Sequence, residues 1–352
     1  MKKGNVLAHA YFAGLQLQGR WGVSSDDVLL ARALGEGLGS YEAPPILFLP
    51  TVTYGVGNVG GERTTRVYIA RYRSPGDYLA LTRPLYLDAD TAFRLAESIR
   101  ARLPSTKIVA SIATPKLSEL RALASSFSKA VDAFEVDLGV LGILYGQRKS
   151  FEAFALDIVE EFVSAAPSPV VVKVSPGVPL SDAFLKLLVD AGVGGIVFSP
   201  HPVYAVGKSL FRVHSPLLSE VYSLIWARLI TELNVSTAIV SDKPLEEIKE
   251  HDPITAFDIV LFDTALMFKH LKIAGTVEND LPLNWRSIAT GLLPSVTLSE
   301  EEVCADVCPY GALNPLSAGE TTDAVADSRC DFCGLCLSLC RTARLVRVLS
   351  PE

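Results

Sequence analysis

The sequence predicts an α/β fold in which a barrel of eight parallel strands precedes a small cysteine-rich domain. Short apolar runs alternate with amphipathic stretches over residues 1–293, which is the pattern of repeated strand–helix units. The runs are continuously apolar, as expected of parallel strands that are buried on both faces. All six cysteines of the 352-residue chain fall in residues 294–352. We therefore expect a (β/α)8 TIM barrel over residues 1–293 and a second domain over residues 294–352.

Eight apolar runs are the candidate strands of this barrel. In chain order they are Trp21–Ser24, Ile46–Thr53, Lys107–Ala113, Ala133–Leu138, Val170–Val174, Gly195–Ser199, Thr237–Val240 and Asp258–Phe262. Eight strands with intervening helices match what a TIM barrel requires. An open, doubly wound sheet is the alternative, but no Gly-x-Gly-x-x-Gly turn follows the first strand.

The helices between these strands have recognisable ends. Asp90 is a candidate N-cap for a helix whose apolar residues repeat at helical spacing up to Leu103. Ser181 is expected to cap a second helix, and Gly192 to end it. A third apolar stripe at helical spacing runs from Leu218 to Leu229.

Charge and hydropathy exclude several classes of partner. The net charge of −7 argues against a nucleic-acid-binding face. No apolar stretch approaches the length of a membrane span. The apolar run near the N-terminus is interrupted by His9, so we do not expect a signal peptide. These observations favour a cytoplasmic protein that binds neither nucleic acid nor membranes.

The cysteines of the second domain have the spacing of an iron–sulfur site. Cys330, Cys333 and Cys336 are separated by two residues each, and Cys340 follows after three more. In bacterial ferredoxin motifs the first three thiolates of such a run hold one cluster, and a cysteine followed by proline supplies the fourth ligand from a distance. Cys308, which precedes Pro309, fits that role. Zinc or a disulfide framework is the alternative, but zinc sites favour two Cys-x2-Cys pairs.

The remaining cysteines do not complete a second cluster. Cys304 and Cys340 would need two more thiolates, and positions 301 and 298 hold Glu301 and Leu298 instead. Arg341 also stands where proline usually follows the fourth cysteine of the motif. We therefore predict one [4Fe–4S] cluster, held by Cys308, Cys330, Cys333 and Cys336. Cys304 and Cys340 are expected to lie close together, either as a thiol pair or as a disulfide.

Two segments are expected to lie over the C-terminal mouth of the barrel, where the active sites of TIM barrels are found. The glycine-rich segment from Tyr54 to Asp77 follows the second strand, although a disordered loop is the alternative. His201 and His214 flank a loop over the same mouth. They are candidates to bind a substrate anion or to satisfy local hydrogen bonds.

Short stretches along the barrel resemble dihydroorotate dehydrogenases. Phe12–Leu17 is similar to their entry hairpin, Ile108–Ile112 to their third strand, Phe134–Leu138 to their fourth and Val170–Pro176 to their fifth. Gly142–Gln147 resembles a loop of dihydropyrimidine dehydrogenase, which pairs this barrel with a C-terminal ferredoxin segment. The resemblance covers nearly the whole chain in order and implies a (β/α)8 flavoprotein with a ferredoxin-type [4Fe–4S] domain.

The resemblance implies a set of FMN contacts in the barrel. Lys173 is similar to the family's lysine that contacts the isoalloxazine ring, and Ser24 and Thr51 would line the ring. Ser241 and Thr264 occupy positions near the phosphate of the family's flavin. FMN is therefore expected as a second cofactor.

The same positions also depart from the family. The Gly-Gly phosphate nest after the seventh strand is replaced here by residues 241–243, where Asp242 is unfavourable for a phosphate unless Lys243 offsets it. A buried lysine needs an anion or a carboxylate, so a pair of Lys173 with Asp137 or Glu135 in an empty barrel is the alternative to a flavin.

The substrate positions differ as well. Tyr145 stands where dihydropyrimidine dehydrogenase has its general-acid cysteine, and it is a candidate acid or a packing aromatic. The family's pyrimidine-reading asparagines appear as Ala80, Asp137 and Pro200. Without these amides a buried pyrimidine edge would lack partners, so the substrate is not expected to be a simple pyrimidine.

Two functions follow from these observations. The first is an oxidoreductase acting on CH–CH bonds, in which a barrel-bound flavin exchanges electrons through the cluster with a one-electron carrier. The second is a flavin-less, degenerate barrel that serves as an electron-relay or scaffold subunit of a redox complex. A homo-oligomer is compatible with either function. A flavin enzyme acting on tRNA bases is disfavoured by the negative charge.

Overall fold

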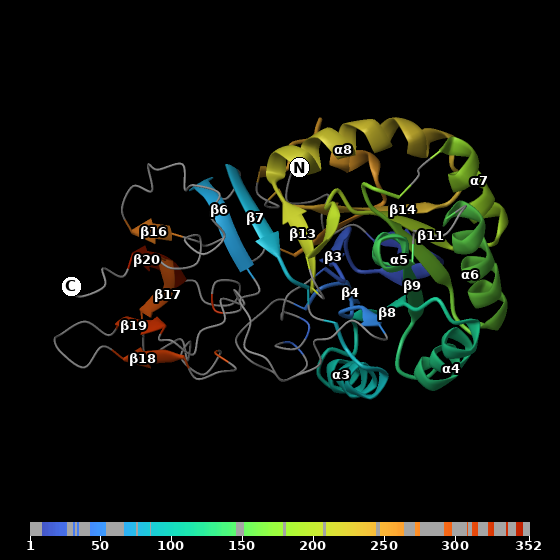
Figure 1. Ribbon diagram of the computed structural model, residues 1–352, viewed down its shortest axis with the longest axis horizontal. Coiled ribbons are helices and arrows are strands. Elements are labelled where there is room, and N and C mark those ends of the chain that lie inside the picture. The colour runs from blue at the N-terminus through green and yellow to red at the C-terminus, as the bar shows by residue number, and fades with distance from the viewer. Residues whose placement is uncertain are drawn as a thin grey trace.

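The structure is a computed structural model, and Figure 1 shows its arrangement. It describes residues 9–26, 31, 34, 43–53, 67–74, 77–84, 86–145, 151–178, 181–206, 209–243, 247–263, 272–274, 292–297, 308, 312–315, 323–326, 336 and 343–347.

Eight parallel strands close into a barrel. In chain order they are β3 (Trp21–Val23), β4 (Ile46–Phe48), β8 (Lys107–Ala113), β9 (Ala133–Asp137), β10 (Val170–Val174), β11 (Gly195–Phe198), β14 (Ser236–Ser241) and β15 (Ile259–Phe262). The ring is closed because β15 pairs with β3, β3 with β4 and β4 with β8, all in parallel. All eight predicted strands are confirmed, and closure of the sheet excludes the doubly wound alternative. The second predicted strand is interrupted, since a separate strand β5 (Val52–Thr53) pairs with the end of β8.

The barrel interior is apolar at one end and polar at the other. Val171 of β10 belongs to an inner apolar cluster, whereas its neighbours Val172 and Val174 belong to the cluster between strands and helices. Alternate residues of a strand point to opposite faces, so Lys173, the next inward position after Val171, faces the interior nearer the C-terminal mouth. Its side chain is fully buried. The charged residues of the chain's core therefore gather at the end where barrel active sites lie.

A two-stranded hairpin packs at the opposite, apolar end. It consists of β1 (Ala10–Phe12) and β2 (Leu15–Leu17), which pair antiparallel. The two turn residues, Ala13 and Gly14, both have positive φ, at 51° and 78°, as a type I′ turn requires. Phe12 is fully buried and joins the inner apolar cluster. The hairpin thus seals the base of the barrel.

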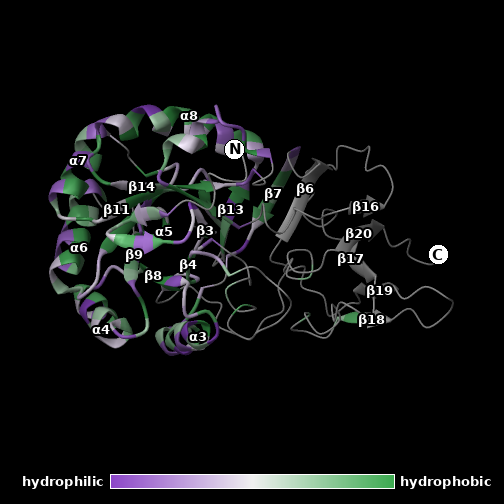
Figure 2. Cartoon of the chain, turned by 180° about the vertical axis from the view of Figure 1, so that it is seen from behind, coloured by the Kyte–Doolittle hydropathy of each residue, from purple (hydrophilic) through white to green (hydrophobic). Residues whose placement is uncertain are grey.

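Helices surround the strands. They are α3 (Ala89–Arg102), α4 (Leu117–Phe127), α5 (Leu138–Tyr145), α6 (Phe151–Ala165), α7 (Asp182–Asp190) and α8 (Pro216–Leu229), with short 3-10 helices η1 (Ile230–Glu232) and η3 (Pro253–Ala256). Figure 2 shows polar residues on the outer sides of α3, α4, α6 and α7, as amphipathic packing on a barrel requires.

The helix ends agree with the sequence in one case and differ in another. Ser181 caps α7 as predicted, because its Oγ accepts a hydrogen bond from Phe184 N at 3.1 Å. The cap of α3 is Asp88 and not Asp90, because the Asp88 carboxylate accepts from Thr91 N at 2.8 Å. Asp90 lies inside the first turn instead, where a negative charge is still favourable.

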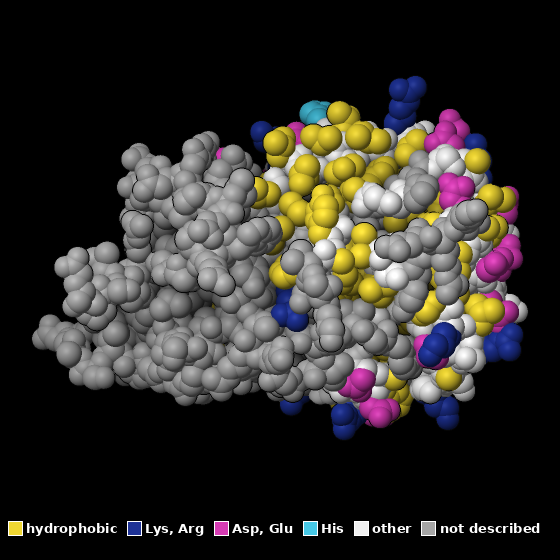
Figure 3. Space-filling view, viewed as in Figure 1, with side chains coloured by type: hydrophobic (Ala, Val, Ile, Leu, Met, Phe, Trp, Pro, Cys, Tyr) yellow, Lys and Arg dark blue, Asp and Glu magenta, His cyan; other side chains and the backbone are white. Residues whose placement is uncertain are grey.

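The predicted third helix is α8, but its apolar stripe faces outward. Ser219, Ser223 and Trp226 form its buried face, whereas residues 217, 221, 224 and 225, all Leu, Val or Ile, are exposed. Apolar side chains gather on this part of the surface in Figure 3. The apolar spacing therefore predicted that this segment is a helix. It did not predict which face of the helix packs on the barrel.

A four-stranded antiparallel sheet is formed by two hairpins inserted into the barrel. The first comprises β6 (Val67–Ser74) and β7 (Asp77–Thr82), between β5 and α3, and the second comprises β12 (Val203–Val206) and β13 (Ser209–His214), after β11. The sheet has the order β12-β13-β7-β6, since β13 pairs with β7. Both hairpins extend from the C-terminal ends of barrel strands, so their junction lies at the mouth.

A five-stranded sheet contains the C-terminal part of the chain and lies to one side of the barrel in Figure 1. Its order is β16 (Lys272–Ala274), β20 (Ala343–Arg347), β17 (Leu292–Thr297), β19 (Asp323–Ala326) and β18 (Leu313–Pro315). The domain boundary expected between residues 293 and 294 falls inside β17, and β16 joins the sheet from upstream of it. No helix among the described residues is long and apolar enough to cross a membrane.

Candidate functional site

A buried network of charged side chains fills the C-terminal mouth of the barrel. Some members lie within or directly after the barrel strands, and the others lie in the second hairpin or just before it. Their side chains are all nearly or fully buried, and they are Asp26, Glu135, Asp137, Lys173, His201, Arg212, His214, Asp242 and Asp263.

Lys173 lies at the centre of one half of this network. Its Nζ forms an ion pair with Asp26 Oδ1, lies 3.5 Å from Asp137 Oδ2 and donates to Ser25 Oγ at 3.0 Å. The predicted pairing of Lys173 with Asp137 is therefore confirmed, and Asp26 is a second carboxylate partner. Glu135, the other predicted partner, accepts a hydrogen bond from Ser25 Oγ at 2.6 Å. The ammonium charge is compensated within the barrel.

Arg212 reaches the same carboxylates from β13. Its Nε lies 2.7 Å from Asp26 Oδ1, and its Nη2 lies 2.6 Å from Asp137 Oδ2. Asp137 in turn accepts from Val140 N at 2.9 Å, which ties the carboxylate to the start of α5. Two cations and two carboxylates thus form a compact cluster that spans the barrel and the hairpin above it.

Burial and charge act in opposite directions on the carboxylates of this cluster. Burial raises the pKa of Asp26, but the adjacent Arg212 and Lys173 outweigh it and hold that pKa well below its usual range. Burial also raises the pKa of Glu135, to about 7, against the lowering effect of Lys173. Glu135 is therefore a member of the network whose protonation changes near neutral pH.

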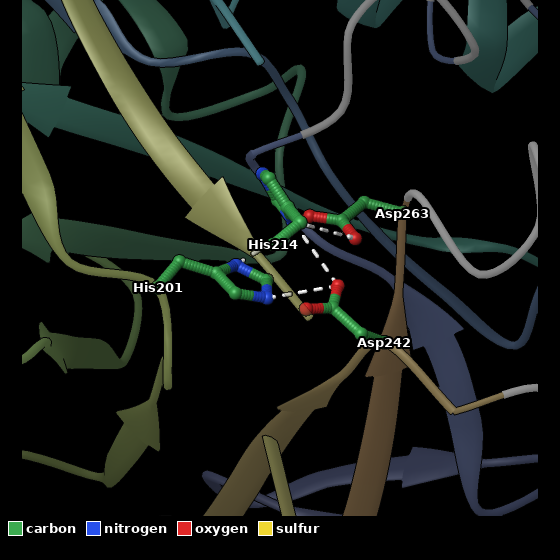
Figure 4. Close-up of side chains that lie close together, drawn as sticks. All are labelled: His201, His214, Asp242 and Asp263. Atoms are coloured by element: carbon green, nitrogen blue, oxygen red, sulfur yellow. Dashed lines mark hydrogen bonds and ion pairs between the residues drawn. The ribbon is translucent and has the colours of Figure 1, made fainter. Parts of the chain in front are cut away.

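The other half of the network consists of two histidines and two aspartates, which we call the His/Asp cluster: His201, His214, Asp242 and Asp263 (Figure 4). His201 Nε2 lies 3.0 Å from Asp242 Oδ1, and His214 Nδ1 lies 3.1 Å from the same oxygen. His214 Nδ1 is also 3.8 Å from Asp263 Oδ1. One ligand atom from each residue can be chosen so that all four lie within 4.8 Å of one another.

Residues outside the His/Asp cluster hold its side chains in place. His214 Nε2 lies 2.6 Å from Thr82 Oγ1, and His201 Nδ1 lies 3.4 Å from Asp26 Oδ2. Asp242 Oδ2 accepts from Ser215 N at 2.7 Å. Each imidazole therefore has one nitrogen directed into the cluster and the other directed at an oxygen atom outside it.

The electrostatics of the His/Asp cluster favour cations. Burial lowers the pKa of His201, but Asp242 and Asp263 outweigh it and raise that pKa to about 10. Conversely, the pKa of Asp242 lies well below its usual range, because His201 and His214 oppose the effect of burial. Asp242 therefore stays ionised and stabilises positive charge on the two histidines beside it.

The predicted FMN contacts are largely engaged by protein groups. Ser24 Oγ accepts from Asp26 N at 3.1 Å, and Thr51 Oγ1 lies 3.0 Å from Ser111 Oγ. Ser241 Oγ accepts from Lys243 N at 3.0 Å. Thr264 and the side chain of Tyr145 lie outside the described residues.

These residues do not fit a flavin phosphate. Asp242 and Asp263 follow the seventh and eighth barrel strands, where the family resemblance locates the phosphate, and both would repel a dianion at short range. Lys243 does not offset them, because its Nζ pairs with Asp252 at 3.0 Å. Lys173 is already paired with Asp26. The described residues at this position therefore do not favour a bound flavin phosphate.

The described cysteines fit a cluster site. Cys308 Sγ accepts a hydrogen bond from Ala312 N at 3.2 Å, and such bonds to sulfur are typical of iron–sulfur sites. Cys336 is 9% exposed and belongs to the apolar cluster that surrounds the barrel strands, against which Cys308 also packs. Both cysteines therefore lie beside the barrel in a partly dry environment. Cys304, Cys330, Cys333 and Cys340 lie outside the described residues.

Sequence reasoning missed the roles of Asp26 and Arg212. Asp26 follows the first predicted strand by two residues, so its position at the mouth carried a signal. Arg212 carried none, because only the pairing of β13 with β7 brings it over the barrel. His201 and His214 were placed correctly at the mouth, but their carboxylate partners come from β14 and β15, far along the chain.

Comparison with known proteins gave no identification: no family model matches the chain, and no curated protein matches it. The closed (β/α)8 barrel is the part of the predicted resemblance that the structure supports. The finer assignment to a flavoprotein family stays a prediction from the sequence.

Proposed function

We propose that the chain is an iron–sulfur electron-transfer protein that holds one [4Fe–4S] cluster and relays single electrons to a redox partner without a flavin. The observation that carries this proposal is the cysteine spacing, in which Cys330, Cys333 and Cys336 are joined by Cys308 from before Pro309. Such a cluster supplies one-electron redox chemistry, and the cysteine thiolates would hold it.

The environment of the described cysteines supports this role. Burial of Cys336 excludes water from one side of the site, and the N–H of Ala312 directed at Cys308 Sγ stabilises negative charge on that sulfur. Both features influence the reduction potential of a cluster. The chain's contribution is therefore to set the potential and to limit solvent access.

The paired charges at the barrel mouth argue against a bound flavin. The network of Lys173, Arg212, Asp26 and Asp137 occupies the mouth with mutually paired charges. A flavin would have to displace these ion pairs, and each separated charge would cost several kcal/mol while buried. The barrel then serves as a rigid support for the cluster domain and for a partner.

A matched pair of cysteine substitutions tests the ligand assignment. In protein purified anaerobically, Cys308→Ser should lose the iron of the cluster, whereas Cys304→Ser, four residues away, should keep about four irons per chain. Iron and sulfide analysis with visible absorption gives the result. Equal loss in both variants, or about eight irons in the unmodified protein, would contradict a single cluster. Zinc in place of iron would overturn the electron-transfer function.

A further inference from the structure

We propose that the His/Asp cluster is a binding site for a divalent first-row transition metal, which fastens the second hairpin to the barrel. The ligands are His201 and His214, which flank the hairpin, and Asp242 and Asp263, which follow β14 and β15. This site is separate from the cysteine residues and does not depend on the cluster.

The donor atoms have the spacing of a coordination shell. Metal–ligand bonds of 2.0–2.2 Å in a tetrahedral site place neighbouring donors about 3.3–3.6 Å apart. The His201–Asp242, His214–Asp242 and His214–Asp263 donor separations are 3.0, 3.1 and 3.8 Å. Two imidazoles and two carboxylates are a donor set that suits zinc, iron and manganese.

His201 gives a second, independent indication. Its side chain is fully buried and its Nε2 has no hydrogen-bond partner, although Asp242 Oδ1 is only 3.0 Å away. The contact is therefore close in distance but wrong in direction for a hydrogen bond. Two donors that share a metal ion have this relation, because each lone pair points at the ion and not at the other donor.

The outer contacts of both histidines match those of metal ligands. A metal-bound histidine usually directs its second nitrogen at a carboxylate, carbonyl or other oxygen, which fixes the ring. Asp26 has this position beside His201 Nδ1, and Thr82 has it beside His214 Nε2. Asp242 is itself held by the N–H of Ser215.

The charges also balance. Lys173 and Arg212 take Asp26 and Asp137 as partners in the adjacent half of the network. Once the imidazoles have released their protons, as metal ligands must, the two aspartates supply two negative charges, which balance one divalent cation. The four side chains are at most 2% exposed, so the site is closed, as in structural rather than catalytic metal sites.

Zinc binding to the full-length, cluster-loaded chain tests the site. The chain is first dialysed against a chelator, and the zinc that remains bound is measured. Added zinc is then titrated by calorimetry under anaerobic conditions. The remaining and the newly bound zinc should sum to about one equivalent per chain. Bound zinc should also raise the melting temperature, because only the folded chain presents the four ligands together. His214→Gln should lose this equivalent and the rise in melting temperature. Glu135→Gln, a buried carboxylate in the same mouth but outside the ligand set, should keep both.

A milder pair of variants keeps the test decisive if His214→Gln does not fold. Thr82→Val should weaken zinc binding by about 10–100-fold, since it removes the oxygen that orients His214, and Thr82→Ser should restore it. The proposal is overturned if the unmodified chain takes up no zinc, which would leave the four residues as ion pairs only. It is equally overturned if the folded His214 or Thr82 variants bind zinc as the unmodified chain does.

Discussion

At the scale of single residues, Lys173 shows how the barrel compensates a charge in its interior. Isolated, a fully buried ammonium would be strongly unfavourable, but here Asp26, Asp137 and Ser25 surround it. Arg212 shares both carboxylates, so no single pair is independent of the others. Such an arrangement is sensitive to the loss of one member, because the partners left behind cannot be rehydrated.

Replacing Lys173 with methionine should therefore destabilise the protein strongly. We expect a loss of about 3–5 kcal/mol in the free energy of unfolding, since Asp26 and Asp137 would lose one of the two cations they share and their buried negative charges would be incompletely compensated. Lys186→Met is the matched control, because Lys186 and Glu232 form an exposed pair worth less than about 1 kcal/mol. Denaturant unfolding of both variants measures the difference. Similar losses in the two variants would show that the buried network does not depend on Lys173.

Glu135 makes a contribution that depends on pH. Its pKa is about 7 in the folded chain and about 4.3 in an unfolded one, so between these values the folded state holds a proton that the unfolded state lacks. Stability due to this group is therefore lost as pH rises through that window. Glu135→Gln has no group that titrates at this position. As the pH rises from 5 to 8, the free energy of unfolding of the variant should therefore increase relative to that of the unmodified protein, by on the order of 2 kcal/mol.

Denaturant unfolding of both proteins at pH 5 and pH 8 checks this expectation. Comparing the difference between the two proteins at each pH removes the contribution of every other titrating group. A difference that is the same at both values would mean that Glu135 is ionised throughout, with a pKa near that of an exposed carboxyl.

At the scale of elements, the strands were predictable and the hairpins were not. A parallel barrel strand is buried on both faces, so runs such as Val170–Val174 are apolar over their whole length and stand out from the sequence. The pairing of β13 with β7 joins segments about 130 residues apart, and no local pattern encodes it. Consequently Lys173 was recognisable as a site residue, whereas its partner Arg212 was not.

Helix α8 shows the limit of periodicity in a different way. Its apolar spacing predicts a helix, but the barrel side is formed by the small residues Ser219 and Ser223 together with Trp226. Small side chains allow α8 to approach closely, and Ser223 satisfies its hydroxyl by donating to the carbonyl of Ser219. Hydrophobicity alone cannot distinguish such a face from an exposed one, because the packing partner decides which face is buried.

At the scale of the whole molecule, the protein combines a charged barrel mouth with a cysteine-rich domain beside the barrel. The C-terminal sheet includes β16 from before residue 293, and Cys336 and Leu313 join the apolar cluster around the barrel strands. The two parts therefore share a core, which suits a cluster held at a fixed position. The charge pattern at the mouth favours metal ions over phosphates.

An anaerobic reductive titration of the purified protein, followed by visible absorption, tests the central claim most directly. A single [4Fe–4S] cluster without a flavin should take up about one electron per chain, with bleaching of the cluster band and no flavin band, even after FMN has been added and excess removed. Uptake of about three electrons per chain with a flavin spectrum would contradict the account, because it would show that FMN binds despite Asp242 and Asp263.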